Sequence, residues 1–260
     1  MIQPDPAEGS GPPRFRASVG SPSAPGVPPG SSVSPWASSV EPAAASPVTE
    51  ESYRILRSRI DLSRLPRFSR DITERVIHAS ADFDYATDLV CDEESLAEGV
   101  AALAAGAPVV ADSTMVAAGI GASPVVCKIG EPLTQRLART ASISRAAAAV
   151  RLAFGEVGPG AFWVVGGGAA ALAEILSRGV EPAFVVGLPA GFVGAAEVKD
   201  ELRASGLRSV SNVSEKGGPT VAVAAFSALL ENALAVAGSQ AGWGPGAPAA
   251  AALTDDDTGW

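Results

Sequence analysis

The sequence predicts an α/β protein with a doubly wound, mainly parallel sheet and helices on both faces of the sheet, in three layers. Short apolar runs alternate with stretches whose apolar residues recur at helical spacing, which is typical of strands joined by crossover helices. The apolar runs end in polar or Gly-rich segments, as in residues 106–114, 162–168 and 184–194. Because the carboxyl ends of parallel strands share one edge of a sheet, these segments are expected to form a ligand site.

Composition divides the chain of 260 residues into three parts. Residues 1–48 are rich in Pro, Ser and Gly without an apolar period, and they are predicted to be a disordered leader. Residues 238–260 include three consecutive aspartates and are predicted to be a disordered acidic tail. The folded domain is therefore expected to span residues 49–237, which is enough chain for one domain with a sizeable core.

Charge and composition exclude several classes of function. A net charge of −9 is unsuited to broad nucleic-acid binding, which requires a basic surface. No apolar segment follows a basic start, and Glu231 and Asn232 interrupt the apolar residues 220–237, so neither a signal peptide nor a membrane span is predicted. Cys91 and Cys127 lack metal-ligand spacing and are expected to be reduced thiols. These features predict a cytoplasmic protein that binds no metal, membrane or nucleic acid.

Three helices are predicted before the first long apolar run. They begin at residue types that favour helix N-termini, near Thr49, Asp71 and Asp92, and Asp71 has a glutamate three residues later as in a capping box. The second helix ends near His78, which is the only histidine.

Strands and helices then alternate to the end of the domain. The first strand ends in the polar residues Asp112, Ser113 and Thr114, which open a small-residue helix. Further strands are predicted at residues 125–129, 162–165, 184–186 and 209–213. Further helices are predicted at residues 133–140, from Ser144, at 172–176, around Glu197 and Lys199, and over 220–237.

Four basic side chains are candidates for function. Histidine readily donates and accepts protons near neutral pH, but a lone histidine at a helix end is more often structural, and spacing alone slightly favours that alternative for His78. Arg145 falls in the first turn of a helix, where the helix dipole disfavours a cation, and this favours a functional reason for its presence. Lys199 and Lys216 both follow strands and are expected to project toward the same edge.

The Gly-rich turn Gly166-Gly-Gly168 raises a nucleotide-binding hypothesis. It follows a strand and precedes a helix, where backbone amides can bind a phosphate. Three alanines follow, so the G-x-G-x-x-G spacing is absent and this is the weakest of the hypotheses.

Five motifs taken together resemble the precorrin-8X methylmutase family, whose members are also called cobalt-precorrin-8 methylmutases. The resemblance covers residues 53–230. The motifs are Arg75-Val-Ile-His78 with Asp82-Phe-Asp-Tyr-Ala86, Ala102-Leu-Ala-Ala-Gly-Ala-Pro-Val-Val-Ala-Asp-Ser-Thr-Met-Val-Ala-Ala-Gly-Ile120, Ser144-Arg-Ala146, Gly187-Leu-Pro-Ala-Gly-Phe-Val-Gly-Ala-Ala-Glu197 with Lys199, and Lys216-Gly-Gly218.

The resemblance implies an isomerase of cobalamin biosynthesis that uses no cofactor. Such an enzyme shifts a methyl group from C11 to C12 of precorrin-8X or cobalt-precorrin-8 and gives hydrogenobyrinate or cobyrinate. The resemblance also implies that His78 protonates or hydrogen-bonds the macrocycle and that Arg145 helps to hold it. A homodimer with pockets near the subunit interface is implied in the same way.

The acetate and propionate arms of such a substrate would need cationic and polar partners. Arg145, Lys199 and Lys216 suit ionised carboxylates, because charge-assisted hydrogen bonds are strong. The other predicted substrate-binding residues belong to the strand-end loops and helix starts, and they are Asp112, Ser113, Thr114, Met115, Ser144, Gly166, Gly191, Phe192, Val193, Gly194 and Gly217.

One loop departs from the family pattern. Where the family reads Gly-Asn-Ala-Pro-Thr-Ala-Leu, this chain has Gly166-Gly-Gly-Ala-Ala-Ala-Leu172 and so lacks an amide, a proline and a hydroxyl. The sequence therefore leaves a second hypothesis open, a non-catalytic tetrapyrrole-binding protein that holds a corrin intermediate.

Overall fold

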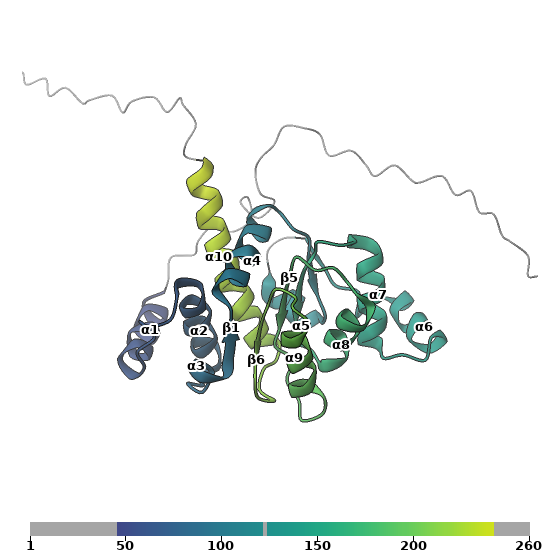
Figure 1. Cartoon of the computed structure of the whole chain (residues 1–260), viewed down its shortest axis with the longest axis horizontal. Coiled ribbons are helices and arrows are strands. Elements are labelled where there is room, and N and C mark those ends of the chain that lie inside the picture. Colours follow the sequence, from purple (N-terminus) through teal and green to yellow (C-terminus); the bar gives the residue numbers. More distant parts are fainter. Residues whose placement is uncertain (1–45, 122–123, 242–260) are drawn as a thin grey trace, which may run out of the picture. The chain divides into compact units, whose positions relative to one another are not determined.

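The computed structural model describes residues 46–121 and 124–241, and its six strands form one sheet in the order β1-β6-β5-β4-β2-β3 (Figure 1). β1 is antiparallel to β6, and every other neighbouring pair is parallel. The strands are β1 (Leu89–Cys91), β2 (Val109–Ala111), β3 (Val125–Val126), β4 (Phe162–Val165), β5 (Phe184–Gly187) and β6 (Ser209–Asn212). The predicted α/β fold with a mainly parallel sheet is confirmed.

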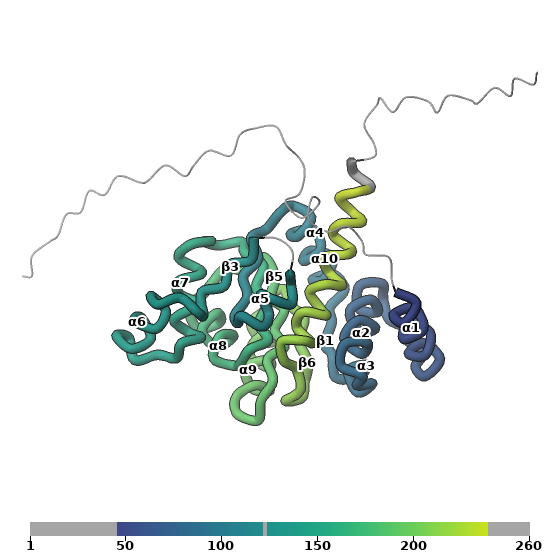
Figure 2. Tube along the Cα trace, turned by 180° about the vertical axis from the view of Figure 1, so that it is seen from behind, coloured from purple at the N-terminus to yellow at the C-terminus, as the bar shows by residue number. Residues whose placement is uncertain are grey.

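Helices cover both faces of this sheet. Successive residues of β4 point to opposite sides, since Phe162 and Val164 lie in one core whereas Trp163 and Val165 lie in the other. The first core is covered by α2 (Arg67–Ser80), α4 (Glu93–Ala104), α5 (Thr114–Ile120) and α10 (Pro219–Ala241). The second is covered by α7 (Arg145–Val157), α8 (Ala169–Arg178) and α9 (Ala195–Ala204). α8 and α9 cover the face of the sheet that is seen in Figure 1, and α10 covers the opposite face, which is seen in Figure 2.

The two central strands explain the continuous apolar runs in the sequence. β4 and β5 are buried at all four of their positions, because both faces of a parallel sheet are covered. The ring centroid of Phe162 lies 5.1 Å from that of Phe184 and 5.6 Å from that of Phe226. These aromatic contacts join β4 to β5 and to α10.

The predicted leader (residues 1–48) and acidic tail (residues 238–260) fall largely outside the described residues. Within the described part, α1 (Pro47–Arg59) begins in the predicted leader and α10 continues into the predicted tail. The helices at the two ends thus extend slightly beyond the expected limits of the domain.

The long apolar helix α10 belongs to the core. Its segment Pro219–Gly238 is long and apolar enough to cross a membrane by length and composition, with a mean hydropathy of 1.7. However, Ala222, Ala225 and Phe226 are buried in the first core, on the same side of the sheet as α2 and α4. This packing is typical of a core helix in a globular protein.

Helix starts were predicted well where the cap is local. The side chains of Asp92 and Ser144 each accept a hydrogen bond from the backbone N–H three residues later, which confirms these two helix starts, and Ser113 caps α5 in the same way. The predictions for Thr49 and Asp71 were wrong, since both residues lie inside helices.

Other groups cap those two helices. Ser46 caps α1, and its Oγ accepts from the N–H of Thr49 at 3.2 Å. The first turn of α2 is capped by Glu93, whose carboxylate accepts from the N–H groups of Phe68 and Ser69. Glu93 lies far along the chain, so spacing within the sequence could not reveal this cap.

Three short elements complete the described part. α3 (Tyr85–Asp88) and the edge strand β1 were not predicted, because four helical residues and three strand residues carry almost no periodicity. The predicted helix at residues 133–140 is α6 (Pro132–Thr140), which packs against α7.

Candidate active site

The direction in which the sheet is built reverses between β2 and β4. The chain passes from β2 outward to β3, then returns to β4 on the other side of β2 and continues to β5 and β6. Ligands of doubly wound proteins bind at the carboxyl ends of the strands beside such a reversal. Asp112 directly follows β2, and Gly166-Gly-Gly168 follows β4.

Asp112 joins the loops that follow these two strands. The side chain is 7% exposed, and its Oδ1 and Oδ2 accept from the N–H groups of Gly166 at 3.2 Å and Gly167 at 2.7 Å. Burial raises the pKa of the carboxyl group, although the two N–H donors oppose the shift. Asp112 therefore ties the loop after β2 to the loop after β4.

The residues after Asp112 turn outward. Ser113 uses its Oγ to cap α5, whereas Thr114 and Met115 are exposed. Met115 is 67% exposed and reaches a groove that also contains His78. The structure thus brings together a predicted catalytic residue and one of the predicted substrate-binding residues.

This groove has a volume of about 360 Å³ and lies between α2, α5 and α10. His78 and Arg75 come from α2, Met115 from α5, and Pro219 and Thr220 from the first turn of α10, with further small and apolar residues along α10. Most of its lining is apolar and only a few polar groups converge there, which is the usual composition of a small-molecule site.

The His78 side chain is positioned by aromatic stacking. The imidazole stacks on Tyr53 with 4.4 Å between ring centroids and 8° between planes. Among the described residues, neither ring nitrogen has a hydrogen-bond partner. Both nitrogens are therefore available to a bound molecule. Nearby Arg75 is partly neutralised by its ion pair with Glu231.

Lys199 was predicted to bind substrate carboxylates, but its ammonium group lies inside the protein. It is fully buried, and its Nζ donates to Asn212 Oδ1 at 2.8 Å, to the carbonyl oxygen of Lys216 at 2.9 Å and to that of Ser214. Burial lowers the pKa of Lys199 to about 8. An ammonium group has three donors, and all three are used inside the protein. Lys199 therefore has no N–H left for a substrate carboxylate.

Asp88 also binds the residues that follow β6. Its carboxylate accepts from the side chain of Asn212 and from both the N–H and the Oγ of Ser214. Burial would raise the pKa of Asp88, but these donors outweigh it and lower the pKa. Sequence reasoning missed Asp88 and Asn212, and the available signal was an asparagine at the carboxyl end of a strand.

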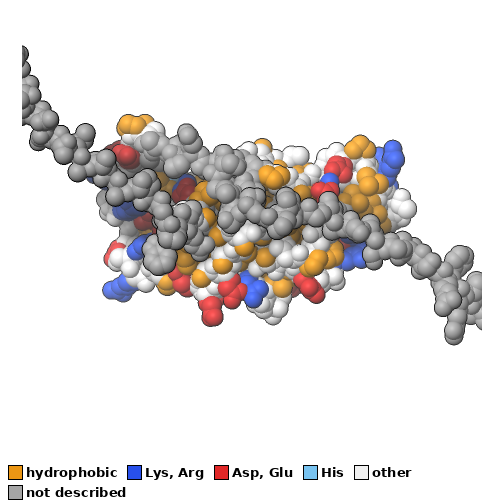
Figure 3. Space-filling model, turned by 90° about the horizontal axis from the view of Figure 1, so that it is seen from above, with side chains coloured by type: hydrophobic (Ala, Val, Ile, Leu, Met, Phe, Trp, Pro, Cys, Tyr) orange, Lys and Arg blue, Asp and Glu red, His pale blue; other side chains and the backbone are white. Residues whose placement is uncertain are grey.

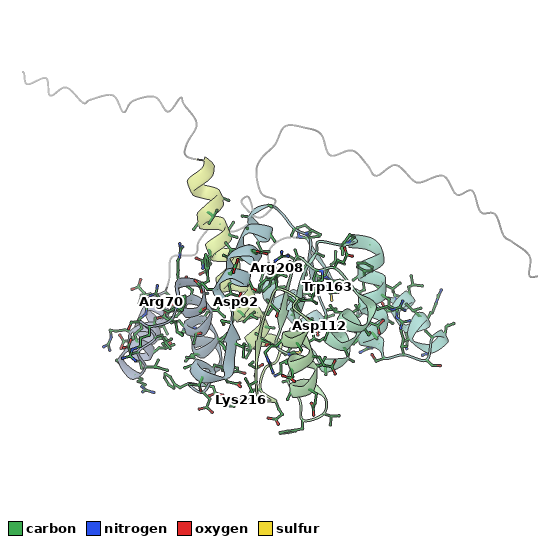
Figure 4. All side chains as sticks on the ribbon, viewed as in Figure 1. Arg70, Asp92, Asp112, Trp163, Arg208 and Lys216 are labelled. Atoms are coloured by element: carbon green, nitrogen blue, oxygen red, sulfur yellow. The ribbon has the colours of Figure 1, made fainter. Side chains whose placement is uncertain are left out.

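Lys216 lies at the lower end of β6 in Figure 4, whereas Arg208 lies near the upper end. Its Nζ is 2.7 Å from Asp82 Oδ2 and 2.6 Å from Asp84 Oδ2, and these carboxylates raise the pKa of Lys216. Its side chain remains 39% exposed. Lys216 is thus paired but accessible, and the following Gly217 has a φ of 143°.

The loop after β5 presents apolar side chains to the outside. Phe192 is 95% exposed and Val193 is 90% exposed. Gly191 has a φ of 146° and donates its N–H to the carbonyl oxygen of Glu215 at 3.0 Å, while Gly194, with a φ of 76°, precedes α9. This loop therefore contacts the segment that carries Lys216, and it stays outside the His78 groove.

Ser144 and Arg145 stand apart from the groove, at the exposed start of α7. Ser144 caps this helix, and within the described ranges Arg145 forms no ion pair. Charges of both signs are interspersed on the face seen in Figure 3. In the described part of the chain, no group of three His, Cys, Asp or Glu side chains is placed to hold a metal ion.

The fold and this edge define an α/β protein with an accessible histidine beside a largely apolar groove and basic side chains near the strand ends. The family described as CbiC, precorrin-8X methylmutase, matches residues 47–232. The chain belongs to the precorrin-8X methylmutase family.

Named relatives and a solved structure agree. The chain is 34% identical to the cobalt-precorrin-8 methylmutase of Methanocaldococcus jannaschii, over 70% of this chain and 91% of the relative. It is 34% identical to the precorrin-8X methylmutase of Pseudomonas aeruginosa, over 70% of this chain and 93% of the relative. A crystal structure of precorrin-8X methylmutase from Thermus thermophilus superposes with a TM-score of 0.65 at 30% identity, covering 73% of this chain and 98% of that one.

Proposed function

We propose that this protein is an isomerase of cobalamin biosynthesis that shifts a methyl group from C11 to C12 of precorrin-8X or cobalt-precorrin-8. The observation that carries the proposal is His78, which faces a largely apolar groove with both ring nitrogens unused by the described residues, in a chain of this family. The product is an isomer of the substrate, so the reaction needs no second substrate.

His78 would supply a proton or a hydrogen bond to the macrocycle while the methyl group moves. General acid catalysis requires a donor held in one direction, and stacking on Tyr53 fixes the plane of the imidazole. The groove between α2, α5 and α10 would hold the apolar part of the macrocycle in a defined orientation.

The carboxylate arms would be held outside the groove. Arg145 and Lys216 are exposed or half-exposed cations that can form charge-assisted hydrogen bonds with acetate and propionate groups. Backbone amides and side chains near the exposed Thr114 and Phe192 would contact the periphery. Asp112 and Lys199 would act indirectly by holding the loops that carry these groups.

The alternative of a non-catalytic tetrapyrrole-binding protein is not favoured by the comparisons, because the matched relatives are named methylmutases. The altered loop at Gly166 does not line the His78 groove. An added Cβ at Gly166 would lie 2.9 Å from the Cα of Pro219, so this glycine serves the close approach of α10. We further propose a homodimer that acts in the cytoplasm, which analytical ultracentrifugation and cell fractionation would test.

Turnover of the pure protein tests the proposal directly. Incubation with precorrin-8X, and separately with cobalt-precorrin-8, should change the absorption spectrum to that of hydrogenobyrinate or cobyrinate. His78→Ala should lower the rate by about 10²- to 10⁴-fold, the usual contribution of a general acid. Conversion by His78→Ala at the wild-type rate would exclude the proposed role of this residue, and tight binding without conversion by the wild type would favour the binding protein.

A further inference from the structure

Lys199 anchors the main chain of a segment that it does not belong to. Its ammonium group is fully buried and donates to two carbonyl oxygens, those of Ser214 and Lys216, as well as to Asn212 Oδ1. A buried lysine is costly, because the charge loses its hydration. Here the cost is offset by three hydrogen bonds that all converge on residues 212–216.

The anchored segment connects three parts of the site. Gly191 donates its N–H to the carbonyl oxygen of Glu215, and Gly218 donates to that of Leu188 at 2.7 Å, so the loop after β5 is bound to it. The side chain of Lys216 reaches Asp82 and Asp84, just after the helix that carries His78. The segment then continues into Pro219 and Thr220, which line the groove.

We propose that Lys199 is a positioning residue for the methylmutase reaction. By fixing residues 214–218, it sets the direction of the Lys216 side chain and the position of Thr220 in the wall of the groove. This inference rests on the proposed function for its kinetic consequences. Lys199 itself would not touch the substrate, since its three donors are already used.

The charges around Lys199 suit such an anchor. Asp88 faces it from α3 and favours its protonated form, Glu215 does so from the loop, and Arg203 on its own helix α9 opposes it. Burial outweighs these and lowers the pKa of Lys199 to about 8. Above this pH the neutral amine has one donor fewer, so one acceptor in residues 212–216 loses its partner.

Kinetics of Lys199→Met test the inference. This variant keeps the length of the side chain and removes its donors, so KM should rise by about tenfold while kcat changes by less than about threefold. In a Lys216→Met background the same change should have a much smaller effect on KM, because both substitutions disturb one binding group. Lys128→Met is the matched control, since among the described residues Lys128 forms ion pairs with Glu131 and Glu156 and with no acceptor in residues 212–218, and it should leave KM unchanged.

Two further readouts distinguish the positioning role from a general loss of folding. In the wild type, KM should rise as the pH passes through about 8, the pKa of Lys199, and Lys199→Met should lack this step. Hydrogen exchange should show faster exchange of the amides of residues 214–218 in Lys199→Met under conditions where the core remains protected.

The outcomes separate this inference from the proposed function. If the wild type does not isomerise the substrate, the proposed function fails, while hydrogen exchange still decides whether Lys199 fixes the segment. Unchanged exchange in residues 214–218, an unchanged KM in Lys199→Met, or full additivity of the Lys199 and Lys216 substitutions would overturn the positioning role.

Discussion

The groove at His78 and the network at Lys199 both lie near the carboxyl edge of the sheet, but they use their polar groups in opposite ways. The imidazole of His78 is half-buried, stacks on Tyr53 and keeps both nitrogens unused by the described residues. The ammonium group of Lys199 is fully buried, and its three N–H donors all form hydrogen bonds within the protein. One region is open to a ligand, whereas the other is closed.

This difference shows that a functional-looking residue at a strand end can serve either the substrate or the scaffold. Asp112 resembles Lys199 in serving the scaffold, because both of its carboxylate oxygens accept from backbone N–H groups, those of Gly166 and Gly167. The open groove depends on these closed clusters, since they hold the loops around it. Substitutions in the closed clusters should therefore affect stability most, and substitutions in the groove should affect it least.

The largest loss of stability is expected from Gly217→Ala, in the closed segment. Gly217 has a φ of 143°, and an added Cβ would overlap the carbonyl oxygens of Leu188 and Pro189. The free energy of unfolding should fall by about 3–5 kcal/mol, because this backbone conformation is almost restricted to glycine. Urea denaturation would measure the change.

Gly168→Ala is the matched control for this prediction. Gly168 also follows a strand, but it has an extended φ of 171° and no heavy atom within 4 Å of an added Cβ. Its midpoint of unfolding should remain close to that of the wild type. Equal losses in both variants would show that residues 214–218 are not unusually constrained.

A smaller loss is expected from Asp112→Ala. The substitution leaves the buried N–H group of Gly166 without its acceptor, which costs about 1–3 kcal/mol, and the N–H group of the exposed Gly167 can bond to water instead. Removing a carboxyl group whose pKa is raised by burial recovers part of this cost, so a net loss of about 1–3 kcal/mol is expected. Thermal unfolding would measure it.

Asp92→Ala provides the comparison, since Asp92 is exposed and, among the described residues, its carboxylate accepts from a single backbone N–H, that of Ser95. It should lose less stability than Asp112→Ala. If the two variants lost the same amount, Asp112 would not be the clamp between β2 and β4.

The sequence predicted the fold better than it predicted the use of each polar residue. Continuous apolar runs identified β4 and β5, because strands buried on both faces have no polar positions. Local caps such as Asp92 and Ser144 were also predictable, since both hydrogen-bonding groups lie within three residues of one another. By contrast, β1 has only three residues and depends on its pairing with β6.

The closed clusters could not be predicted because their partners are distant in the chain. Lys199 binds the segment at 212–216, and Asp88 reaches Ser214 across a separation of 126 residues. The sequence shows the charge of Lys199, but it does not show which acceptors the ammonium group meets in the folded chain. His78 and Met115 were both predicted as residues of the substrate site, and both line the same groove in the structure.

The pH dependence of stability can test Asp88, the anionic half of the closed network. Its pKa is lowered in the folded state, so its stabilising effect is fully present above the ordinary value of 3.8 and is lost as the pH falls through the lower folded pKa. Asp88→Asn should therefore be less stable than the wild type by about 2 kcal/mol at neutral pH, and this difference should shrink below pH 3.8.

Denaturation midpoints measured over a pH series would show this convergence. Asp84→Asn is the control, because the Asp84 side chain is 77% exposed and its one ion pair with a described residue is to Lys216. Its midpoint should stay close to the wild-type value, since exposed ion pairs contribute little. A constant difference between Asp88→Asn and the wild type down to the lowest pH would contradict the assigned hydrogen bonds.

The smallest loss of stability is expected beside the open groove, from Tyr53→Leu, because Tyr53 stacks on the groove residue His78. Tyr53 is half-buried and its ring contributes a stack on His78, which is worth about 0.5–1.5 kcal/mol. Turnover should decrease more than stability, because the imidazole loses the contact that fixes its plane and would sample directions that do not face the macrocycle. Tyr53→Phe keeps the ring and should retain both properties. If Tyr53→Leu lost as much stability as Asp112→Ala but kept its turnover, the groove would be part of the scaffold, and the contrast between open and closed regions would fail at His78 itself.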